Sequence, residues 1–375
     1  MFLAWAEIRR ARLRFALLTG AVGLLVFLVL FVEAIAGNLT GKFIGALDRQ
    51  SADVLVYGAD ARNNLEGSRV SDAQVLRVRR VAGVAGAAPL GEGTFSVEAG
   101  GATRDAVLFG HRPGGPGAPA ALAAGRAVAH RGEAVASSGS AGEGFALGDV
   151  VRVLPDGERL RIVGLVDDAN YAVLPVLFVP YSTYIAARRT VNPDARMVPP
   201  SAVAVWVADG MAPGDVARRI DADVPGVQAL TRTQAVERSP GVRAVRQSLS
   251  VVSLLFFLVV PVVIGLFLLI VTVQKTASLT LLRALGVPAS ALVRAVLVQV
   301  AIVLGGGVAV ALVLLYAAGG LLERAGAATG VALPVGTAAG IVGALIGLSA
   351  LALVPTVRRL RRIDPHAAVA GAGIE

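Results

Sequence analysis

The stretch Gln274–Arg294, QKTASLTLLRALGVPASALVR, lies between two long apolar runs, Leu249–Val273 and Ala295–Ala318. Four of its residues recur at the spacing of one helix face: Ser278, Leu281, Leu282 and Leu285. This spacing predicts a short amphipathic helix, which Gly286 can end in a left-handed conformation and Pro288 cannot continue. The stretch therefore indicates a surface helix held between two membrane spans, although an ordinary loop between helices fits the spacing equally well.

The composition of the chain favours a membrane protein. Of the 375 residues, 55% are hydrophobic, and the mean hydropathy is +0.70, which is too apolar for an ordinary soluble domain. The chain has no cysteine and three histidines, so a disulfide framework or a thiolate metal site is excluded and a histidine metal site is not expected. We therefore predict no metal site.

The apolar runs divide the chain into nine segments. The predicted order is a cytoplasmic amphipathic helix (1–14), a first span (15–37), an extracytoplasmic domain (38–246), a second span (247–273), a cytoplasmic coupling helix and link (274–290), a third span (291–318), a short outer loop (319–334), a fourth span (335–357) and a cytoplasmic tail (358–375). A secretory signal ending at the A-x-A sequence Ala34–Ala36 is the alternative for the first span. The apolar run is longer than the usual core of such a signal, which favours an uncleaved anchor.

Residues 38–246 have the composition of a soluble domain. They hold 23 basic and 21 acidic residues, with frequent Pro and Gly between short β-rich runs. Two helices are predicted at Ser71–Arg80 and Asp215–Ile220, and Arg112–Ala120 is a turn-rich candidate boundary between two lobes. The predicted strands are Ala52–Tyr57, Gly93–Val97, Ala102–Gly110, Glu133–Ser137, Val150–Leu154, Leu160–Val166, Leu177–Val179, Ser201–Val207 and Val227–Leu230.

The charge distribution predicts the orientation. Four arginines precede the first span, three basic residues lie in the link and four arginines follow the last span, whereas the outer loop has one. The positive-inside rule then places both termini and the link in the cytoplasm. The net charge of +9 is thus explained by topology, and no nucleic-acid partner is expected.

Glycines line one face of the fourth span at spacings of four, three and four residues: Gly336, Gly340, Gly343 and Gly347. Small residues on one face let helix backbones approach closely. The face is predicted to pack against another helix, either of a second subunit or of the same chain.

No enzyme motif is present. Gly37–Phe43 (GNLTGKF) resembles a phosphate-binding loop but is one residue short and lacks the hydroxyl residue that binds magnesium. We interpret Asp167-Asp168 as a solvated turn and Arg188-Arg189 as a solvated helix end rather than an anion site. The spans hold few ionisable residues, with Glu33 near a boundary, which argues against an ion pathway.

Several strings together resemble the MacB/FtsX-type ABC transporter permeases. The resemblance is carried by TLLRALGVP at Thr280–Pro288, ADVLV at Ala52–Val56, VAGVAGAAPL at Val81–Leu90, LGDVVRV at Leu147–Val153, RIVGLV at Arg161–Val166, FVPYSTY at Phe178–Tyr184, VPGVQALT at Val224–Thr231 and VPTVRRLRRIDPHAAV at Val354–Val369. The resemblance implies an α-helical membrane protein with four transmembrane helices. It also implies an α/β extracytoplasmic domain, with a mixed porter-like lobe and a β-rich inserted lobe, between the first two helices.

The resemblance also implies a function without catalysis in this chain. A separate cytoplasmic ATPase, which would bind ATP and Mg, would dock on the coupling helix through Ser278, Leu281, Leu282, Arg283, Leu285 and Gly286. Two permease subunits, alike or different, would couple hydrolysis to movement of the outer domains in the bacterial inner membrane. The load would be a lipid, lipoprotein, peptide or hydrophobic compound, with membrane lipids and an extracytoplasmic adaptor or substrate protein as further partners. The alternatives are an FtsX-like subunit that controls a cell-wall hydrolase and a four-span receptor or scaffold without an ATPase.

Overall fold

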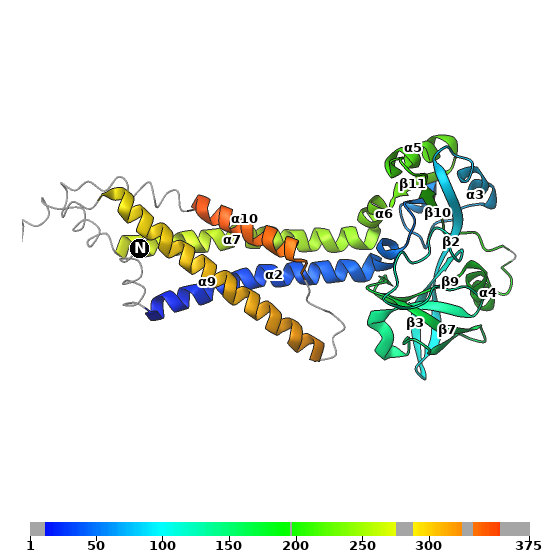
Figure 1. Ribbon diagram of the computed structural model, residues 1–375, viewed down its shortest axis with the longest axis horizontal. Coiled ribbons are helices and arrows are strands. Elements are labelled where there is room, and N and C mark those ends of the chain that lie inside the picture. The colour runs from blue at the N-terminus through cyan, green and yellow to red at the C-terminus, as the bar shows by residue number, and fades with distance from the viewer. Residues whose placement is uncertain (1–11, 196, 275–287, 325–332, 353–375) are drawn as a thin grey trace, which may run out of the picture. The chain divides into compact units, whose positions relative to one another are not determined.

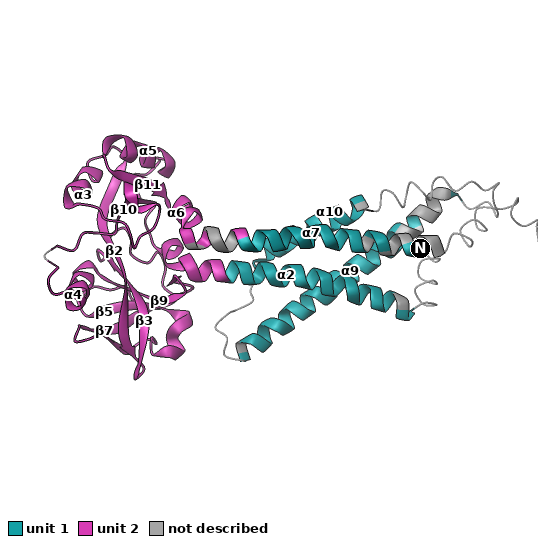
Figure 2. Cartoon of the chain, turned by 180° about the vertical axis from the view of Figure 1, so that it is seen from behind, with its two compact units in different colours: residues 1–38, 248–375 teal, residues 39–247 magenta. Residues whose placement is uncertain are grey.

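The computed structural model describes residues 12–195, 197–274, 288–324 and 333–352. The chain forms two compact units (Figure 2). Unit 1 comprises Met1–Asn38 and Ser248–Glu375, and unit 2 comprises Leu39–Gln247.

Unit 1 is built from long apolar helices. These are the larger parts of α2 (Arg12–Arg49) and α7 (Pro240–Gln274), together with α9 (Ala289–Arg324) and α10 (Val335–Ala352) (Figure 1). Their core is formed by residues such as Val26, Leu30, Val260, Val303, Leu315 and Leu345. Two stretches, Phe15–Arg49 and Leu297–Leu322, are long and apolar enough to cross a membrane, and Gln247–Val263 and Val335–Leu351 are shorter apolar stretches. The apolar helices fit a membrane protein, and the number of four spans stays a prediction.

Two helices extend past the ends that the sequence predicts for them. The first span was expected to end at residue 37, but α2 continues without a break to Arg49. The third span was expected to end at residue 318, but α9 continues to Arg324 through residues assigned to the outer loop. A helix can extend beyond the part that crosses a membrane, so the predicted ends of the two spans stay predictions.

The first half of unit 2 is a four-stranded antiparallel sheet. Its order is β11 (Val227–Thr231), β1 (Val54–Gly58), β10 (Ala202–Val207) and the first part of β2 (Val84–Ala99). Two amphipathic helices, α3 (Asp72–Val78) and α5 (Pro213–Asp223), pack on it through a core that includes Val54, Val56, Val78, Val203, Val216 and Ile220. The helix α6 (Arg232–Arg238) follows β11, and the 3-10 turn η1 (Ala59–Ala61) follows β1.

The second half of unit 2 continues the same sheet through β2. The second part of β2 pairs with β3 (Ala102–His111), which runs parallel to β9 (Leu174–Pro180). The sheet then passes to β5 (Glu133–Ser137), β7 (Arg159–Val166) and β4 (Ala124–Gly125), with β6 (Val150–Val153) and β8 (Asn170–Tyr171) beside this path. The 3-10 turn η2 (Ser138–Glu143) follows β5, and the helix α4 (Tyr181–Val191) packs against β2, β3 and β9.

The β-rich half is inserted into the mixed half. The chain leaves the first sheet inside β2, where Leu90 still pairs with Ala202 and Gly91 pairs with Gly110, and it returns at β10. The loop predicted as a lobe boundary, Arg112–Ala120, follows β3 along the chain, whereas the chain itself passes from one half to the other inside β2. The loop also contacts the first half, because a Cβ placed on Gly117 would lie 3.1 Å from Cβ of Ala204 on β10. The expectation of a β-rich insertion agrees with the topology, because the chain leaves the first sheet inside β2 and returns to it at β10. The passage between the halves lies within one strand and not in a loop.

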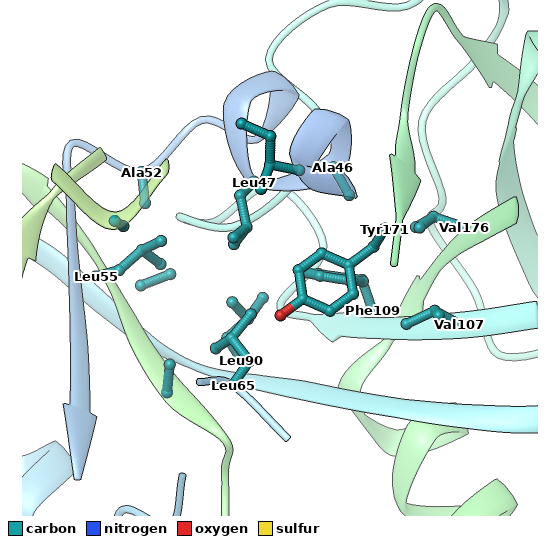
Figure 3. Close-up of a cluster of buried hydrophobic side chains, with 14 of the residues drawn as sticks. Ala46, Leu47, Ala52, Leu55, Leu65, Leu90, Val107, Phe109, Tyr171 and Val176 are labelled. Carbon is teal, nitrogen blue, oxygen red and sulfur yellow. The ribbon is translucent and has the colours of Figure 1, made fainter. Parts of the chain in front are cut away.

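The end of α2 belongs to the core of unit 2. Ile44, Ala46 and Leu47 are buried in a cluster that also contains Leu55 of β1 and Tyr171 of β8 (Figure 3). The amides of residues 172 and 173 donate hydrogen bonds to the carbonyls of residues 43 and 42, which fixes the last turns of α2 against the inserted half. A single helix thus contributes both an apolar stretch of unit 1 and part of the core of unit 2.

Candidate functional site

The predicted ATPase contact lies outside the described residues. Ser278, Leu281, Leu282, Arg283, Leu285 and Gly286 fall between the end of α7 at Gln274 and the start of α9 at Ala289. The role of these residues stays a prediction. The structure describes the helices of unit 1 and the sheet of unit 2, and the candidate site is built from these.

Helices α2 and α9 approach each other closely at glycines. A Cβ placed on Gly23 would lie 2.8 Å from Cγ1 of Val310. A Cβ placed on Gly307 would lie 2.7 Å from Cγ1 of Val22. Both distances are shorter than carbon atoms tolerate, so this contact requires glycine on each helix.

The glycine face predicted on the fourth span is open in the described structure. A Cβ on Gly336, Gly340, Gly343 or Gly347 would meet no atom of the described residues within 4 Å. The helix packing assigned to these residues therefore stays a prediction. Within the described part of the chain, no neighbouring helix fills this face.

A polar contact joins the first two helices of unit 1. The hydroxyl of Ser253 on α7 donates a hydrogen bond of 2.5 Å to Oε1 of Glu33 on α2. Glu33 itself is half-buried. The contact holds a carboxyl group between two largely apolar helices.

Helices α9 and α10 enclose an open apolar groove of about 1040 Å³. Its lining includes Leu312, Tyr316, Leu321 and Val342, and Arg324 is the one charged residue among the described residues that line it. The groove has the character of a surface that contacts lipid or another apolar partner.

In unit 2, a buried carboxyl group lies where the two halves of the sheet meet. The side chain of Glu92 on β2 is 2% exposed, and its Oε2 has no hydrogen-bond partner among the described residues. Burial, with a smaller contribution from the charge of Glu66, raises the pKa of Glu92 to about 7. No sequence signal indicated this residue, because an alternating strand pattern does not separate a buried Glu from an exposed one.

Two other titratable side chains are buried close by. The pKa of His111, at the end of β3, is lowered to about 4 by burial, and its Nε2 has no partner among the described residues. Burial also raises the pKa of Tyr171 well above its usual value, and the charge of Glu92 adds to this effect. Within the described ranges, no group of three His, Cys, Asp or Glu side chains is arranged to hold a metal ion.

The predicted acidic and basic pairs have different environments. Asp167 accepts a hydrogen bond from Ser138, and Asp168 pairs with Arg49 in an exposed turn, as the sequence indicates. Arg189 is exposed at the end of α4, but Arg188 is half-buried. The prediction of a solvated helix end is therefore wrong for Arg188.

The chain is similar over nearly its whole length to bacterial membrane permeases. It is 25% identical over 374 residues, 99% of both chains, to the uncharacterized ABC transporter permease Rv0072 of Mycobacterium tuberculosis. It is 25% identical over 380 residues, again 99% of both chains, to the uncharacterized ABC transporter permease Mb2592 of Mycobacterium bovis. It is 21% identical over 318 residues, 84% of this chain and 85% of the relative, to the putative hemin transport system permease protein HrtB of Staphylococcus epidermidis.

Two solved structures are similar to part of the chain. The periplasmic region of MacB from Actinobacillus actinomycetemcomitans has a TM-score of 0.36 and 13% identity, and the match covers 51% of this chain and 92% of that one. The extracellular domain of the transporter YknZ from Gram-positive bacteria has a TM-score of 0.35 and 14% identity, and the match covers 48% of this chain and 100% of that one. No protein-family model matches the chain. The resemblance to an ABC transporter permease that the sequence motifs indicate is confirmed by the named relatives.

Proposed function

We propose that this chain, which is similar from end to end to ABC transporter permeases, is the membrane subunit of a transporter driven by a separate cytoplasmic ATPase. The similarity over 99% of both chains is the observation that carries the proposal. The ATPase binds ATP and Mg, and two permease subunits, identical or different, form the membrane part. This chain contributes no catalytic residue.

The course of α2 supports mechanical coupling. The helix runs from Arg12 to Arg49, and its last turns are part of the buried core of unit 2. An unbroken helix can transmit a displacement that a flexible loop would absorb. We therefore propose that movement of the coupling helix, caused by the ATPase, tilts the spans and opens or closes unit 2.

The distribution of basic residues supports the orientation. With both termini and the link in the cytoplasm, unit 2 lies outside the inner membrane. This orientation requires four spans, two of which are provided by stretches that are long and apolar enough.

The proposed load is an apolar or amphiphilic compound, a lipid, a lipoprotein or a peptide. An extracytoplasmic adaptor or substrate protein would receive or deliver it. The apolar groove between α9 and α10 supports a load that is handled at the bilayer rather than passed through an aqueous pore. Hemin, which the names of three relatives mention, is one hydrophobic compound of this class and a suitable first candidate.

The test is purification of the tagged full-length chain from its native membrane, followed by an ATPase assay of what accompanies it. We expect a co-purifying ATPase whose turnover is reduced by Leu282→Asp with Arg283→Asp, while membrane insertion is unchanged. The control is Arg189→Asp, which alters an exposed charge on α4 of unit 2 and should leave turnover unchanged. If the ATPase binds the Leu282/Arg283 variant and turns over ATP as it does with the unchanged chain, the assigned docking site is contradicted.

The same purification separates the alternatives. Recovery of the chain without any ATPase would favour a receptor or scaffold. An associated ATPase together with a bound cell-wall hydrolase, and no transported load, would favour signalling control of that hydrolase.

A further inference from the structure

A small pocket on unit 2 is lined by residues from both halves of the unit. It has a volume of about 190 Å³ and lies between the end of α4, the segment that follows α4, and the segment that precedes α3. At about 30 Å³ per water molecule, it holds the equivalent of roughly six waters. This size suits one charged group with a short stem. Arg188 of α4 and Arg69 of the segment before α3 both line it.

Arg188 is held in a fixed orientation. Its Nε donates a 3.0 Å hydrogen bond to the hydroxyl of Tyr184, and its Nη2 donates one of 3.3 Å to the backbone carbonyl of Glu92. The guanidinium carbon also lies 5.8 Å from the ring centre of Phe95 and 5.7 Å from that of Tyr184. These cation–π contacts and hydrogen bonds order the guanidinium group before any ligand arrives.

Glycines on β2 and β3 make room for this arrangement. A Cβ on Gly93 would lie 3.1 Å from the guanidinium carbon of Arg188, and one on Gly91 would lie 2.3 Å from the ring of Tyr184. The paired residue Gly110 approaches the same tyrosine equally closely. The strands are therefore shaped to receive the Tyr184–Arg188 pair.

Neither pocket arginine has a carboxylate partner in the described chain. Arg69 donates from Nη1 to the backbone carbonyls of Glu66 and Ser68, at 3.4 and 3.3 Å. No ion pair within 4.0 Å involves Arg69 or Arg188 among the described residues. Each guanidinium group has five N–H donors, so both retain donors for another acceptor.

The nearest buried carboxyl group compensates these charges only in part. Because burial raises the pKa of Glu92 to about 7, this side chain is partly protonated at neutral pH. Glu66 is exposed, where its charge is screened by solvent. The pocket therefore keeps a positive character.

An apolar rim borders the arginines. Val191 is 58% exposed and Met197 is 80% exposed, and both line the pocket together with Val198 and Pro199. Exposed apolar side chains beside the ordered guanidinium group of Arg188 and the exposed one of Arg69 suit a ligand with an anionic head and an apolar stem. We propose that this pocket binds a carboxylate carried on a short apolar stem, with Arg188 and Arg69 holding the carboxylate oxygens and Met197 and Val191 contacting the stem.

This chemistry occurs in two sources, a fatty acid and the C-terminus of an apolar peptide. The site does not depend on the transport function, because it rests on contacts within unit 2. Binding is therefore measurable without an ATPase.

The test uses the full chain in phosphatidylcholine nanodiscs with hexanoate as the probe and saturation-transfer NMR as the readout. Hexanamide, which has the same shape without the charge, is the matched ligand. We expect saturable hexanoate binding that hexanamide does not displace. Arg69→Gln and Arg188→Gln should each weaken it about tenfold or more, as expected when a hydrogen bond to a charged group is lost. Arg69 is exposed, so its variant tests the proposal even if the change at Arg188 disturbs folding.

Arg189→Gln is the control, because Arg189 follows Arg188 on the same helix and does not line this pocket. It should bind hexanoate as the unchanged chain does. If peptides are the source, the peptide Leu-Ala-Leu with a free C-terminus should displace hexanoate and its amidated form should not. If octanoate displaces hexanoate and the peptide does not, the source is a fatty acid. Absence of saturable hexanoate binding, equal binding by the Arg69 and Arg188 variants, or equal competition by hexanamide would overturn the proposal.

Discussion

Replacing Glu92 with Gln should change how the stability of unit 2 depends on pH. In the folded chain the Glu92 side chain is buried, its Oε2 has no partner in the described part of the chain, and its pKa is about 7 instead of 4.5. Between these two pH values the folded state keeps the proton and the unfolded state loses it. The folded state therefore binds more protons in this window, and the free energy of unfolding falls as the pH rises from about 4.5 to about 7.

The size of the effect follows from the pKa difference. One pKa unit corresponds to about 1.4 kcal/mol, so a rise from 4.5 to about 7 corresponds to about 3 kcal/mol. This destabilisation is fully present above pH 7 and absent below pH 4.5. It is a large fraction of the 5–15 kcal/mol that typically stabilises a domain.

His111 acts in the opposite direction over much of the same range. Its folded pKa of about 4 lies below its usual value of 6.5, so between these values the unfolded state binds more protons and stability rises with pH. The two effects oppose each other between about pH 4.5 and 6.5, and above 6.5 that of Glu92 continues alone. In the unchanged chain, the contribution of this pair to the free energy of unfolding should be nearly constant between about pH 4.5 and 6.5 and should fall above 6.5. In the Glu92→Gln variant, the free energy of unfolding should rise with pH between about 4.5 and 6.5. In a His111→Gln variant, it should fall over the same range.

Urea unfolding followed by tryptophan fluorescence measures this difference. Trp5 and Trp206 are the two tryptophans of the chain, so a Trp5→Phe background leaves Trp206 as the reporter. Trp206 lies on β10, and its indole N–H donates a 3.0 Å hydrogen bond to the carbonyl of Ser51, both within unit 2. If the free energy of unfolding has the same pH dependence with and without Glu92→Gln, the assigned burial cost is refuted.

Three further changes test the packing. Gly307→Ala should lower the thermal stability of the detergent-solubilised chain by the equivalent of about 1–3 kcal/mol, because its Cβ would lie 2.7 Å from Val22. Gly305→Ala is the control and should leave this stability unchanged, because its Cβ meets no described atom within 4 Å. Leu47→Ala should cost about 2–5 kcal/mol of unit 2 stability in the Trp206 assay, because Leu47 is 1% exposed in the core. Ser71→Ala should cost about 1 kcal/mol in the same assay, because the Ser71 hydroxyl caps α3.

Controls distinguish packing from general damage. Leu147→Ala removes the same number of carbon atoms as Leu47→Ala. Because Leu147 is 50% exposed, this substitution should lower the free energy of unfolding only a little. A Ser71→Thr variant keeps the capping hydroxyl and should retain stability. Equal losses for the two leucines, or for alanine and threonine at Ser71, would contradict the assigned roles.

The sequence predicted most elements of unit 2 because alternation and turn residues are local signals. The strand predicted at Leu160–Val166 agrees with β7, and the helix predicted at Ser71–Arg80 contains α3. The first part of β2, from Val84 to Leu90, was not predicted as a strand. It is rich in Ala, Gly and Pro, so side-chain alternation carries little information there, and pairing with β10 and β3 determines its conformation.

The buried polar groups could not be predicted for a different reason. Burial of Glu92 and the environment of Arg188 depend on contacts between residues far apart in sequence, such as Arg188 with the carbonyl of Glu92. A basic pair at a helix end is most often solvated, and only the approach of β2 and its glycines makes Arg188 different. The continuation of α2 past Asn38 is likewise decided by tertiary packing, because Ile44 and Leu47 find buried partners in unit 2.

The pocket and the buried carboxyl group should be linked through charge. The groups that interact electrostatically with Glu92 are Glu66, Arg188, Arg69 and Tyr171. When Glu92 ionises near pH 7, its charge offsets part of the positive potential of the two arginines, so carboxylate binding should weaken as the pH rises from 6 to 8. Because hexanoate is ionised throughout this range, a loss of affinity cannot come from the ligand. The Glu92→Gln variant, which keeps the side-chain shape without the charge, should bind hexanoate with the same affinity at both pH values. An equal loss of affinity in that variant would show that a group other than Glu92 causes the pH dependence.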